Sequence, residues 1–411
     1  MKVFKQRSTM MTGNLVSIFA GHDANISFFN GTTGNYHVIE IERLTRSRYF
    51  RLHVDNDNRK ILDILRECQQ IAEEHWGIQN EYDAVLVASD GTLSKSLLKK
   101  AFNSKKFLTI STHHENHAAC AFYQSPFDRA TVISFDGGGD DGFFNLFSAS
   151  EEGLLHLKEI PSDFGGGYLI LASLIHEVSS HSSHPLALAG KMMGLSAYGQ
   201  VKEELVEPIT EFLFDRNFSK LNQNLEMGFR EGYNPWEDPL GNGIYSGDEA
   251  YDMARTFQEA FEVGFDAAIQ EMDLADPICI AGGGALNVLL NQRLLQSGER
   301  DVYCPPNPND SGISLGHLLN FKKPKGPVDV TYSGIPILDL AKLDLYSAHY
   351  GGRKISKREI AERLKLGQII GVVYGDSEVG PRALGNRSIL CDPSLPGMKD
   401  ALNHRIKFRE W

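Results

Sequence analysis

His113 and His117 lie four residues apart, and roughly two hundred residues later Asp310 stands in a turn that also contains a glycine. On a helix, positions i and i+4 share a face, so both imidazoles can point at one ion. A distant carboxylate would complete a set of two histidines and one acid, which suits a divalent metal that keeps open positions for substrate. The alternative is a histidine pair that serves packing or lies at the surface. We predict that His113, His117 and Asp310 are metal ligands.

A second group of reactive side chains lies near the end of the chain. The segment Gly380–Ser388 contains Arg382, Arg387 and Ser388 beside small residues. Guanidinium groups match phosphate and carboxylate oxygens in a bidentate manner. Such a cluster in an acidic protein predicts a small dianionic ligand, since the alternative of a solvated basic face does not explain the adjoining glycines.

His22 and Asp23 occupy a bend between two predicted strands. An ionisable pair at such a bend could orient a water molecule or a hydroxyl group for proton transfer. The plain alternative is an aspartate that stabilises the turn. We treat both residues as candidate catalytic groups.

Three glycine-bearing bends, at 136–142, 165–167 and 282–284, could surround one nucleotide. None of them fits the Walker pattern, and a glycine triplet is more often a simple turn. A strand that leads through glycines into a helix nevertheless favours an anion at the helix start. Lys191 is a candidate phosphate contact or a solvated lysine, and Asn287 could bond a ribose or phosphate or cap its helix. The candidate nucleotide contacts are Gly137, Gly138, Gly139, Gly166, Lys191, Gly283, Gly284 and Asn287.

The overall composition limits the class of protein. The chain has 411 residues, 42% of them hydrophobic and 23% charged, enough for two or three soluble domains. A net charge of −12 argues against a broad polyanion-binding surface. The five cysteines are far apart and predict reduced thiols. We expect a cytoplasmic protein without a membrane segment or signal peptide, since the apolar runs are too short for either.

The pattern of apolar residues predicts two similar α/β halves. Each half begins with a strand that leads into an acidic or glycine-rich bend, followed by a hairpin and then helices. Strands are predicted at 15–20, 26–29, 36–41, 84–88, 130–135, 143–148, 154–159, 278–281 and 369–374. Helices are predicted at 57–75, from His113 onward, and at 168–178, 251–272 and 358–364. The fold class is therefore α/β, with a duplicated unit around a cleft.

Taken together, these segments resemble the NodU/CmcH-type O-carbamoyltransferase family over nearly the whole chain and in the family's order. The strings Gly380–Leu390 and Arg405–Trp411 are highly specific, whereas the glycine clusters are not. The other matching segments are Gly21–Ala24, His113–Ala118, Asp136–Gly139, Gly190–Gly199, Gly282–Asn287 and Asn309–Gly312.

The resemblance implies a fold and a reaction. The fold would be two RNase H-like subdomains of the actin, sugar-kinase and chaperone ATPase class, followed by a YrdC-like domain. The implied domains are 14–128 with the metal histidines, 129–326 with the nucleotide loops and the metal aspartate, a linker at 327–356, and the start of the YrdC-like carbamoyl-phosphate domain at 357–411. The family is similar in using carbamoyl phosphate and ATP to make a carbamoyl-adenylate, from which the carbamoyl group passes to an acceptor hydroxyl.

The same resemblance implies roles for the residues. His113, His117 and Asp310 match metal ligands, with Fe²⁺ expected and Zn²⁺, Mn²⁺ or Mg²⁺ as alternatives. Arg382, Arg387 and Ser388 match the carbamoyl-phosphate side, and the glycine bends match the adenylate side. His22 is our first candidate for proton transfer.

Relatives continue well beyond the Arg405–Trp411 string, so we expect that most of the YrdC-like domain is absent here or is a separate chain. The rival readings are a TsaD-type tRNA threonylcarbamoyl transferase and an inactive nucleotide-binding subunit that requires a partner chain. A small-molecule acceptor is favoured over a modified nucleobase, and a homodimer is left open.

Overall fold

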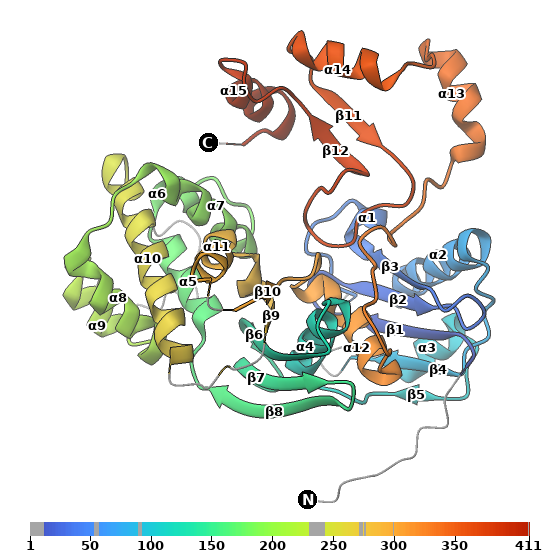
Figure 1. Cartoon of the computed structure of the whole chain (residues 1–411), viewed down its shortest axis with the longest axis horizontal. Coiled ribbons are helices and arrows are strands. Elements are labelled where there is room, and N and C mark those ends of the chain that lie inside the picture. The colour runs from blue at the N-terminus through green and yellow to red at the C-terminus, as the bar shows by residue number, and fades with distance from the viewer. Residues whose placement is uncertain are drawn as a thin grey trace, which may run out of the picture.

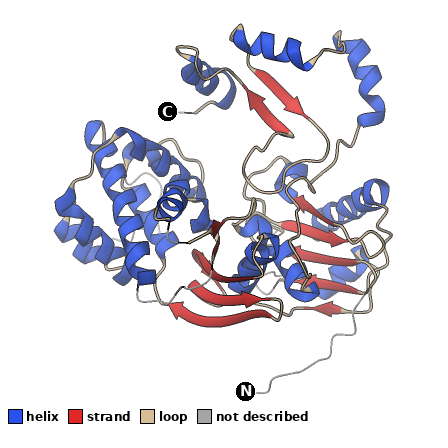
Figure 2. Cartoon of the chain, viewed as in Figure 1, coloured by secondary structure: helices blue, strands red, loops and turns tan. Residues whose placement is uncertain are grey.

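The computed structural model describes residues 12–52, 57–88, 93–229, 243–270, 274, 277–298, 300–409 and 411. Two five-stranded sheets form its centre (Figures 1 and 2). The first sheet has the order β3-β2-β1-β4-β5, and the second has the order β10-β9-β6-β7-β8. The strands of the first sheet are β1 (Leu15–Phe19), β2 (Asn25–Phe29), β3 (Tyr36–Glu40), β4 (Ala84–Val87) and β5 (Phe107–Leu108). Those of the second are β6 (Arg129–Gly139), β7 (Gly142–Ser150), β8 (Gly153–Ile160), β9 (Ile278–Ala281) and β10 (Val302–Tyr303).

The two sheets share one topology. In each, three consecutive strands form an antiparallel meander, and two later strands add in parallel on the other side of the first strand. Because both sheets follow the same order, the duplicated RNase H-like α/β unit expected from the sequence is confirmed. The central strands of the two sheets, β1 and β6, carry apolar residues on both faces and are buried for most of their lengths.

Helices cover the sheets unequally. The first subdomain carries α1 (Ile41–Thr45), α2 (Asn58–Trp76) and α3 (Lys95–Ala101). The helices of the second gather on one side in Figure 1: α5 (Phe164–Ser173), α6 (His176–Ser179), α7 (Leu188–Leu195), α8 (Glu203–Asp215), α9 (Phe218–Asn224), α10 (Asp248–Gln270) and α11 (Val288–Gln296). They enclose the largest apolar core with β6 and β7, in which Phe135, Phe144 and Phe265 pack together.

Two helices cross between the subdomains. Helix α4 (His113–Gln124) follows the first sheet in sequence but packs on β6 and β9 of the second. Helix α12 (Ile313–Lys322) comes after the second sheet but packs on β1 and β2 of the first. The predicted boundary at residue 128 separates α4 from the second sheet in sequence, whereas in the structure α4 packs on that sheet. Since α4 and α12 also pack against each other, they join the two halves.

Several predicted elements differ in their bounds. The predicted strand 130–135 extends through the glycines to Gly139 as part of β6. The predicted helix 168–178 is instead two helices, α5 and α6, and α5 begins at Phe164 because the Asp163 carboxylate accepts a hydrogen bond from Gly166 N. The predicted helix 251–272 is α10, and residues 271–272 lie outside the described residues.

The predicted linker at 327–356 packs on the first subdomain in one part and contains a helix in another. Its first part packs on the first subdomain, where Val38 N donates to Ser333 O and Val330 is buried. Its second part contains helix α13 (Leu343–Tyr350). The chain then forms α14 (Lys357–Lys365), the antiparallel pair β11 (Ile370–Val373) and β12 (Arg387–Leu390), and α15 (Met398–Leu402).

The C-terminal part lies across the top of both subdomains in Figure 1. It contacts the first subdomain through Gly380 N, which donates to Glu40 Oε1 at 3.1 Å. It contacts the second through Trp411, which packs on the edge of the large apolar core. Within the described ranges, no helix has both the length and the apolar character that a membrane crossing requires.

Candidate metal centre

Four side chains from distant parts of the sequence converge at the junction of the two subdomains. His117 Nε2 lies 3.1 Å from His113 Nε2, 3.0 Å from Asp136 Oδ2 and 3.5 Å from Asp310 Oδ1. His113 Nε2 lies 3.5 Å from the same Asp310 oxygen. Both imidazoles and Asp310 are buried, and one donor atom from each of the four residues lies within 4.8 Å of all the others. Two imidazole nitrogens and two carboxylates form a donor set that suits Fe²⁺, Zn²⁺ or Mn²⁺.

Helix α4 places the two histidines on one face. Its first turn is fixed by the Glu115 carboxylate, which accepts from Thr112 N at 3.0 Å. Two further carboxylates come from the β6–β7 turn, where Asp140 accepts from His113 N and Asp141 accepts from His114 N. Carboxylates at a helix N-terminus are favourable, so this hairpin and the helix fix each other.

Asp310 is positioned from the opposite subdomain. It begins the short helix η4 (Asp310–Gly312) that precedes α12. Asn25, on β2, donates from Nδ2 to Asp310 O at 2.8 Å, and its Oδ1 accepts from Ser314 N at 3.1 Å. Asn25 is fully buried, so its amide fixes the turn before α12 against the first sheet. Sequence reasoning did not identify Asn25, although it follows the His22–Asp23 bend directly.

Asp136 belongs to this cluster, although the sequence analysis assigned it only to the predicted nucleotide bend at 136–142. It follows the buried part of β6, and its carboxylate also accepts from Gly137 N at 2.6 Å and Gly283 N at 2.9 Å. The available signal was its position, since a carboxylate at the end of a buried strand points out of the sheet edge. The three glycines that follow Asp136 instead indicated a turn that binds a ligand through its backbone.

The charges in the cluster support one another. Burial by itself raises the pKa of Asp136 and of Asp310, but the nearby imidazoles hold the pKa of each carboxyl below its usual range. Burial lowers the pKa of His117, and hydrogen bonds to Asp136 and Asp310 outweigh it, so the pKa is raised. Both acids are therefore anionic at neutral pH and able to bind a cation.

His22 lies beside this cluster, as a catalytic candidate must. Its Nε2 is 3.3 Å from Asp310 Oδ2, and its Nδ1 is 3.2 Å from Asp23 Oδ2. Burial lowers the pKa of His22, but Asp310 and Asp23 together raise it to about 9. Asp23 adopts a φ of 58°, a left-handed conformation that turns the chain sharply between β1 and β2.

The three glycine bends meet around Asp136. A Cβ on Gly165 would lie 2.7 Å from Gly137 N, and one on Gly282 would lie 2.1 Å from Phe135 O. Gly282 also has a φ of 89°, which a side chain would strain. The bends at 165–167 and 282–284 therefore each lie against the backbone at residues 135–137. Their role in nucleotide binding stays a prediction.

Two other predicted nucleotide contacts have partners within the protein. Lys191 Nζ donates to His181 O. Asn287 exchanges two hydrogen bonds of 3.0 Å with Gln258 and accepts from Leu290 N at 3.1 Å. The helix-cap alternative therefore describes the Asn287 side chain in this structure, and a role in nucleotide binding stays a prediction.

The C-terminal arginines hold loops together. The Arg387 guanidinium donates to the carbonyls of Tyr374, Gly375 and Ile335, at 2.9, 3.0 and 3.3 Å. Ser388 Oγ accepts from Gly385 N at 2.9 Å. Arg382 is exposed and reaches the second subdomain, where it donates to Leu286 O at 3.0 Å. A carbamoyl-phosphate role for these residues stays a prediction.

Glu378 organises this loop, a role that sequence reasoning missed. Its Oε1 accepts from the backbone N–H groups of Leu384, Asn386 and Arg387 at 2.8 to 2.9 Å. Burial opposes the charged form, but these N–H groups lower the pKa of Glu378 to about 2. One carboxylate thus fixes the backbone between Leu384 and Arg387.

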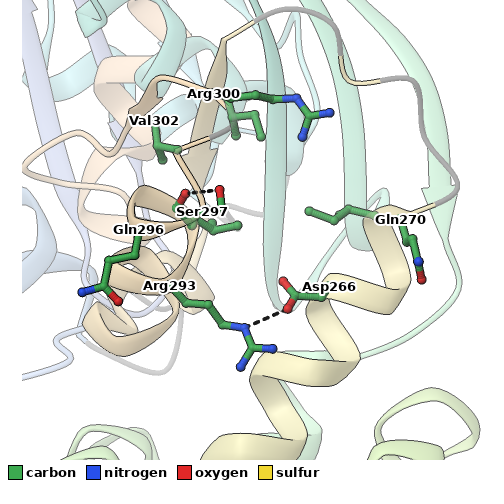
Figure 3. A pocket seen from close by; sticks show the side chains of 10 residues that line it. Asp266, Gln270, Arg293, Gln296, Ser297, Arg300 and Val302 are labelled. Atoms are coloured by element: carbon green, nitrogen blue, oxygen red, sulfur yellow. Dashed lines mark hydrogen bonds and ion pairs between the residues drawn. The ribbon is translucent and has the colours of Figure 1, made fainter.

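Two hollows lie in the second subdomain. One, of about 620 Å³, lies between α10 and α11, where Arg293 Nε donates to Asp266 Oδ2 at 2.8 Å (Figure 3). None of its lining residues belongs to the metal cluster or the glycine bends. The other, of about 500 Å³, is lined by Met193, Gly194, Ser196 and Ala197 and by the start of α11 at Val288 and Leu289. Helix α11 follows the 282–284 bend.

Comparison with known proteins identifies the family. Residues 40–319 match the family described as "Carbamoyltransferase N-terminus", and residues 361–411 match "Carbamoyltransferase C-terminus". The first match alone covers more than half of the sequence. The chain therefore belongs to the carbamoyltransferase family.

Individual relatives agree with this assignment. Nodulation protein U of Sinorhizobium fredii is 32% identical over 72% of this chain and 56% of its own length. The 3'-hydroxymethylcephem-O-carbamoyltransferase of Streptomyces clavuligerus is 27% identical over 96% of this chain and 76% of its own. Nodulation protein NolNO of S. fredii is 28% identical over 77% of this chain and 48% of its own, so the chain spans about half the length of several curated relatives it matches. Among solved structures, full-length HypF aligns with a TM-score of 0.43 at 14% identity, over 76% of this chain and 55% of its own.

Proposed function

We propose that this protein transfers a carbamoyl group from a carbamoyl-adenylate to an acceptor hydroxyl, using a divalent ion held by His113, His117, Asp136 and Asp310. The observation that carries the proposal is the convergence of these four side chains at the 136–139 bend, against which the other two glycine bends lie. Membership of the carbamoyltransferase family supports the reaction.

The donor set fits a bound metal. Four ionisable side chains meet within 4.8 Å at the junction, and the two imidazole Nε2 atoms approach to 3.1 Å. Bringing so many ionisable groups together is costly unless a cation compensates the carboxylates. We propose Fe²⁺, with Zn²⁺, Mn²⁺ or Mg²⁺ as alternatives. When bound, the ion would supply Lewis-acid stabilisation of negative charge that develops on an oxygen.

The adenylate would lie against the glycine bends. We infer that Gly137–Gly139, Gly166 and Gly283–Gly284 lie along the phosphate, because glycine backbone allows close approach of a ligand. In this structure the N–H groups of Gly137 and Gly283 donate to Asp136. The adjoining hollow of about 500 Å³ presents Arg255, Glu259 and Glu262, whose polar atoms suit ribose hydroxyls. Arg382, Arg387 and Ser388 stay our candidates for the carbamoyl-phosphate side, and Arg382 is exposed at this border.

The transfer step has a simple balance. The acceptor oxygen attacks the carbamoyl carbon, the bond from that carbon to the phosphate oxygen breaks, and AMP leaves with the electron pair. A cation bound to Asp310 would offset the negative charge that raises the pKa of His22, so that the neutral imidazole could take the hydroxyl proton. Asp23 orients the ring, which is partly exposed beside the cluster. Carbamoyl phosphate and ATP would supply the adenylate in the whole protein.

The test measures metal content and turnover separately. We expect about one divalent ion per chain by elemental analysis, lost in the His113→Ala/His117→Ala variant, and release of AMP from synthetic carbamoyl-adenylate. Unchanged metal content in that variant would overturn the metal assignment. Binding of metal and nucleotide without AMP release would instead favour the inactive-subunit reading, and product on tRNA alone would favour the TsaD-type reading. The acceptor class, the cytoplasmic location and a homodimer remain predictions.

A further inference from the structure

The segment that follows β3 wraps the bend carrying His22. Ala24 N donates to Phe50 O, and Leu52 N donates to Ala20 O, each at 3.0 Å. The backbone at residues 50–52 therefore holds both ends of the 20–24 bend. The side chains just before it, at positions 48 and 49, are in this way fixed relative to His22.

Tyr49 connects the two subdomains at this place. Its ring stacks on His184 of the second subdomain, with ring centres 4.4 Å apart and planes inclined by 23°. Tyr49 has a φ of 57°, an uncommon conformation for a large side chain. Tyr49 N donates to Glu42 Oε2 at 3.1 Å, which helps to hold that conformation. A strained aromatic residue at a subdomain junction is a feature that functional sites often retain.

Positive charge accompanies the stacked pair. Arg48 donates to Tyr49 Oη at 3.1 Å, and its guanidinium carbon lies 5.0 Å from the centre of the same ring. Burial lowers the pKa of His184, and the charges of Arg51, His22, Asp23 and Arg48 act on it in that order. Since His184 stacks on Tyr49, and residues 50–52 bond to both ends of the bend that carries His22, the stacked pair lies next to that bend. Arg48 is exposed, so its charge is accessible from solvent in a protein whose net charge is −12.

We propose that Tyr49, His184 and Arg48 form one wall of the acceptor site, and that the acceptor carries an anionic group, phosphate or carboxylate, which Arg48 binds. The inference rests on the proposed function, because it places this wall beside the residue that takes the acceptor proton. Stacked rings exclude water from the reacting carbon, and an arginine at their edge holds an anion that steers the hydroxyl toward His22.

The first experiment separates this inference from the proposed function. AMP is titrated into the metal-loaded protein by calorimetry, and we expect binding; its absence would count against the adenylate site and hence against the proposed function. With AMP at saturation, inorganic phosphate and acetate are then titrated in separate arms. We expect at least one of the two to bind at one equivalent, and the stronger ligand identifies the class of anion. Absence of binding in both arms would overturn the inference.

The second experiment assigns the binding to the wall. Arg48→Gln should lower the affinity for the anion at least about tenfold, the effect of losing one charge-assisted hydrogen bond. Arg66→Gln removes the same charge from the exposed face of α2 and should leave anion binding unchanged. Equal losses of anion affinity in the two variants would indicate a general effect of net charge and would refute the proposed role of Arg48. A loss of AMP affinity in Arg48→Gln would assign the anion site to the nucleotide and also refute it.

The rings are tested without disturbing the backbone. Tyr49→Asn retains a residue that tolerates positive φ, and His184→Asn retains a side chain that can accept from Leu186 N, as His184 does. Each should increase the hydrolysis of carbamoyl-adenylate by water several-fold, whereas Tyr49→Phe, which keeps the ring, should not. Hydrolysis that is unchanged in both asparagine variants would contradict a water-excluding wall.

Discussion

Gly316 of α12 lies against the backbone carbonyl of Asn116 of α4, so closely that a Cβ on Gly316 would be 1.9 Å from that oxygen. This contact lets the two crossing helices approach without an intervening side chain. Since α4 carries His113 and His117, and α12 begins directly after Asp310, their close approach brings the three side chains together. The geometry of the candidate metal centre thus depends on a residue that touches no ligand.

Gly316→Ala should separate the helices and impair the centre. A backbone atom cannot move aside as a flexible side chain can, so we expect a loss of about 2 kcal/mol or more in unfolding free energy, together with weaker metal binding. Thermal unfolding and metal titration measure the two effects. Gly326→Ala is the matched control, because its Cβ would have no neighbour within 4 Å. Equal behaviour of both variants would refute the role given to the helix contact.

Asp136 should contribute to metal affinity as a fourth ligand. Asp136→Asn keeps the size of the side chain but removes the charge, and we expect metal affinity to fall at least about tenfold. His114→Asn is the control on the same helix. Its ring packs against those of His113 and His117, but its nitrogens contact groups outside the four-residue set: Nδ1 lies 2.7 Å from Ser134 Oγ and Nε2 lies 3.1 Å from Gly142 O. Full metal affinity in Asp136→Asn would restrict the centre to three ligands.

His317 should make the protein sensitive to mild acid. Burial lowers the pKa of His317 to about 4, from an ordinary value of 6.5. Between these two pH values the unfolded chain binds a proton that the folded chain does not, so stability falls as the pH drops from 6.5 towards 4. This change amounts to roughly 3 kcal/mol, since a tenfold change in proton affinity corresponds to ~1.4 kcal/mol.

Denaturant unfolding at pH 7 and pH 4.5 measures that dependence. His317→Leu should reduce the loss of stability between the two pH values, and His349→Leu, at an exposed position on α13, should not. An identical pH dependence in wild type and His317→Leu would contradict the assignment.

Glu378 should stabilise the loop from Leu384 to Arg387 through its charge. Its pKa of about 2 lies below the ordinary 4.5, so its contribution is present above pH 4.5 and is lost as the pH falls towards 2. Glu378→Gln keeps an acceptor oxygen without the charge. We expect faster hydrogen exchange at the amides of Leu384, Asn386 and Arg387, with exchange in β1 unchanged. Full protection at these amides would show that the charge is dispensable.

Part of this architecture is present in the local sequence. The alternation of short apolar runs and turn residues predicts β1 to β4 and β6 to β9, because each strand must bury its side chains between neighbours. The two-residue edge strands β5 and β10 were not predicted, because so short a segment has no periodicity. The four-residue spacing of His113 and His117 predicts a shared helix face, and the structure places them on α4 as expected. These features depend on neighbours along the chain, so they can be predicted from the local sequence.

Other parts depend on contacts between distant segments. Nothing near Asp136 distinguishes a metal ligand from a turn residue, and its place beside His117 follows only from how β6 meets α4. The anion-binding role of Arg387 stays a prediction, but the backbone carbonyls that its guanidinium contacts could not be predicted, because carbonyls have no signature in sequence. Local periodicity thus determined the elements and one pair of ligands. Tertiary packing decided which elements exchange between the subdomains and which polar groups face one another, because those choices depend on shape and burial across hundreds of residues.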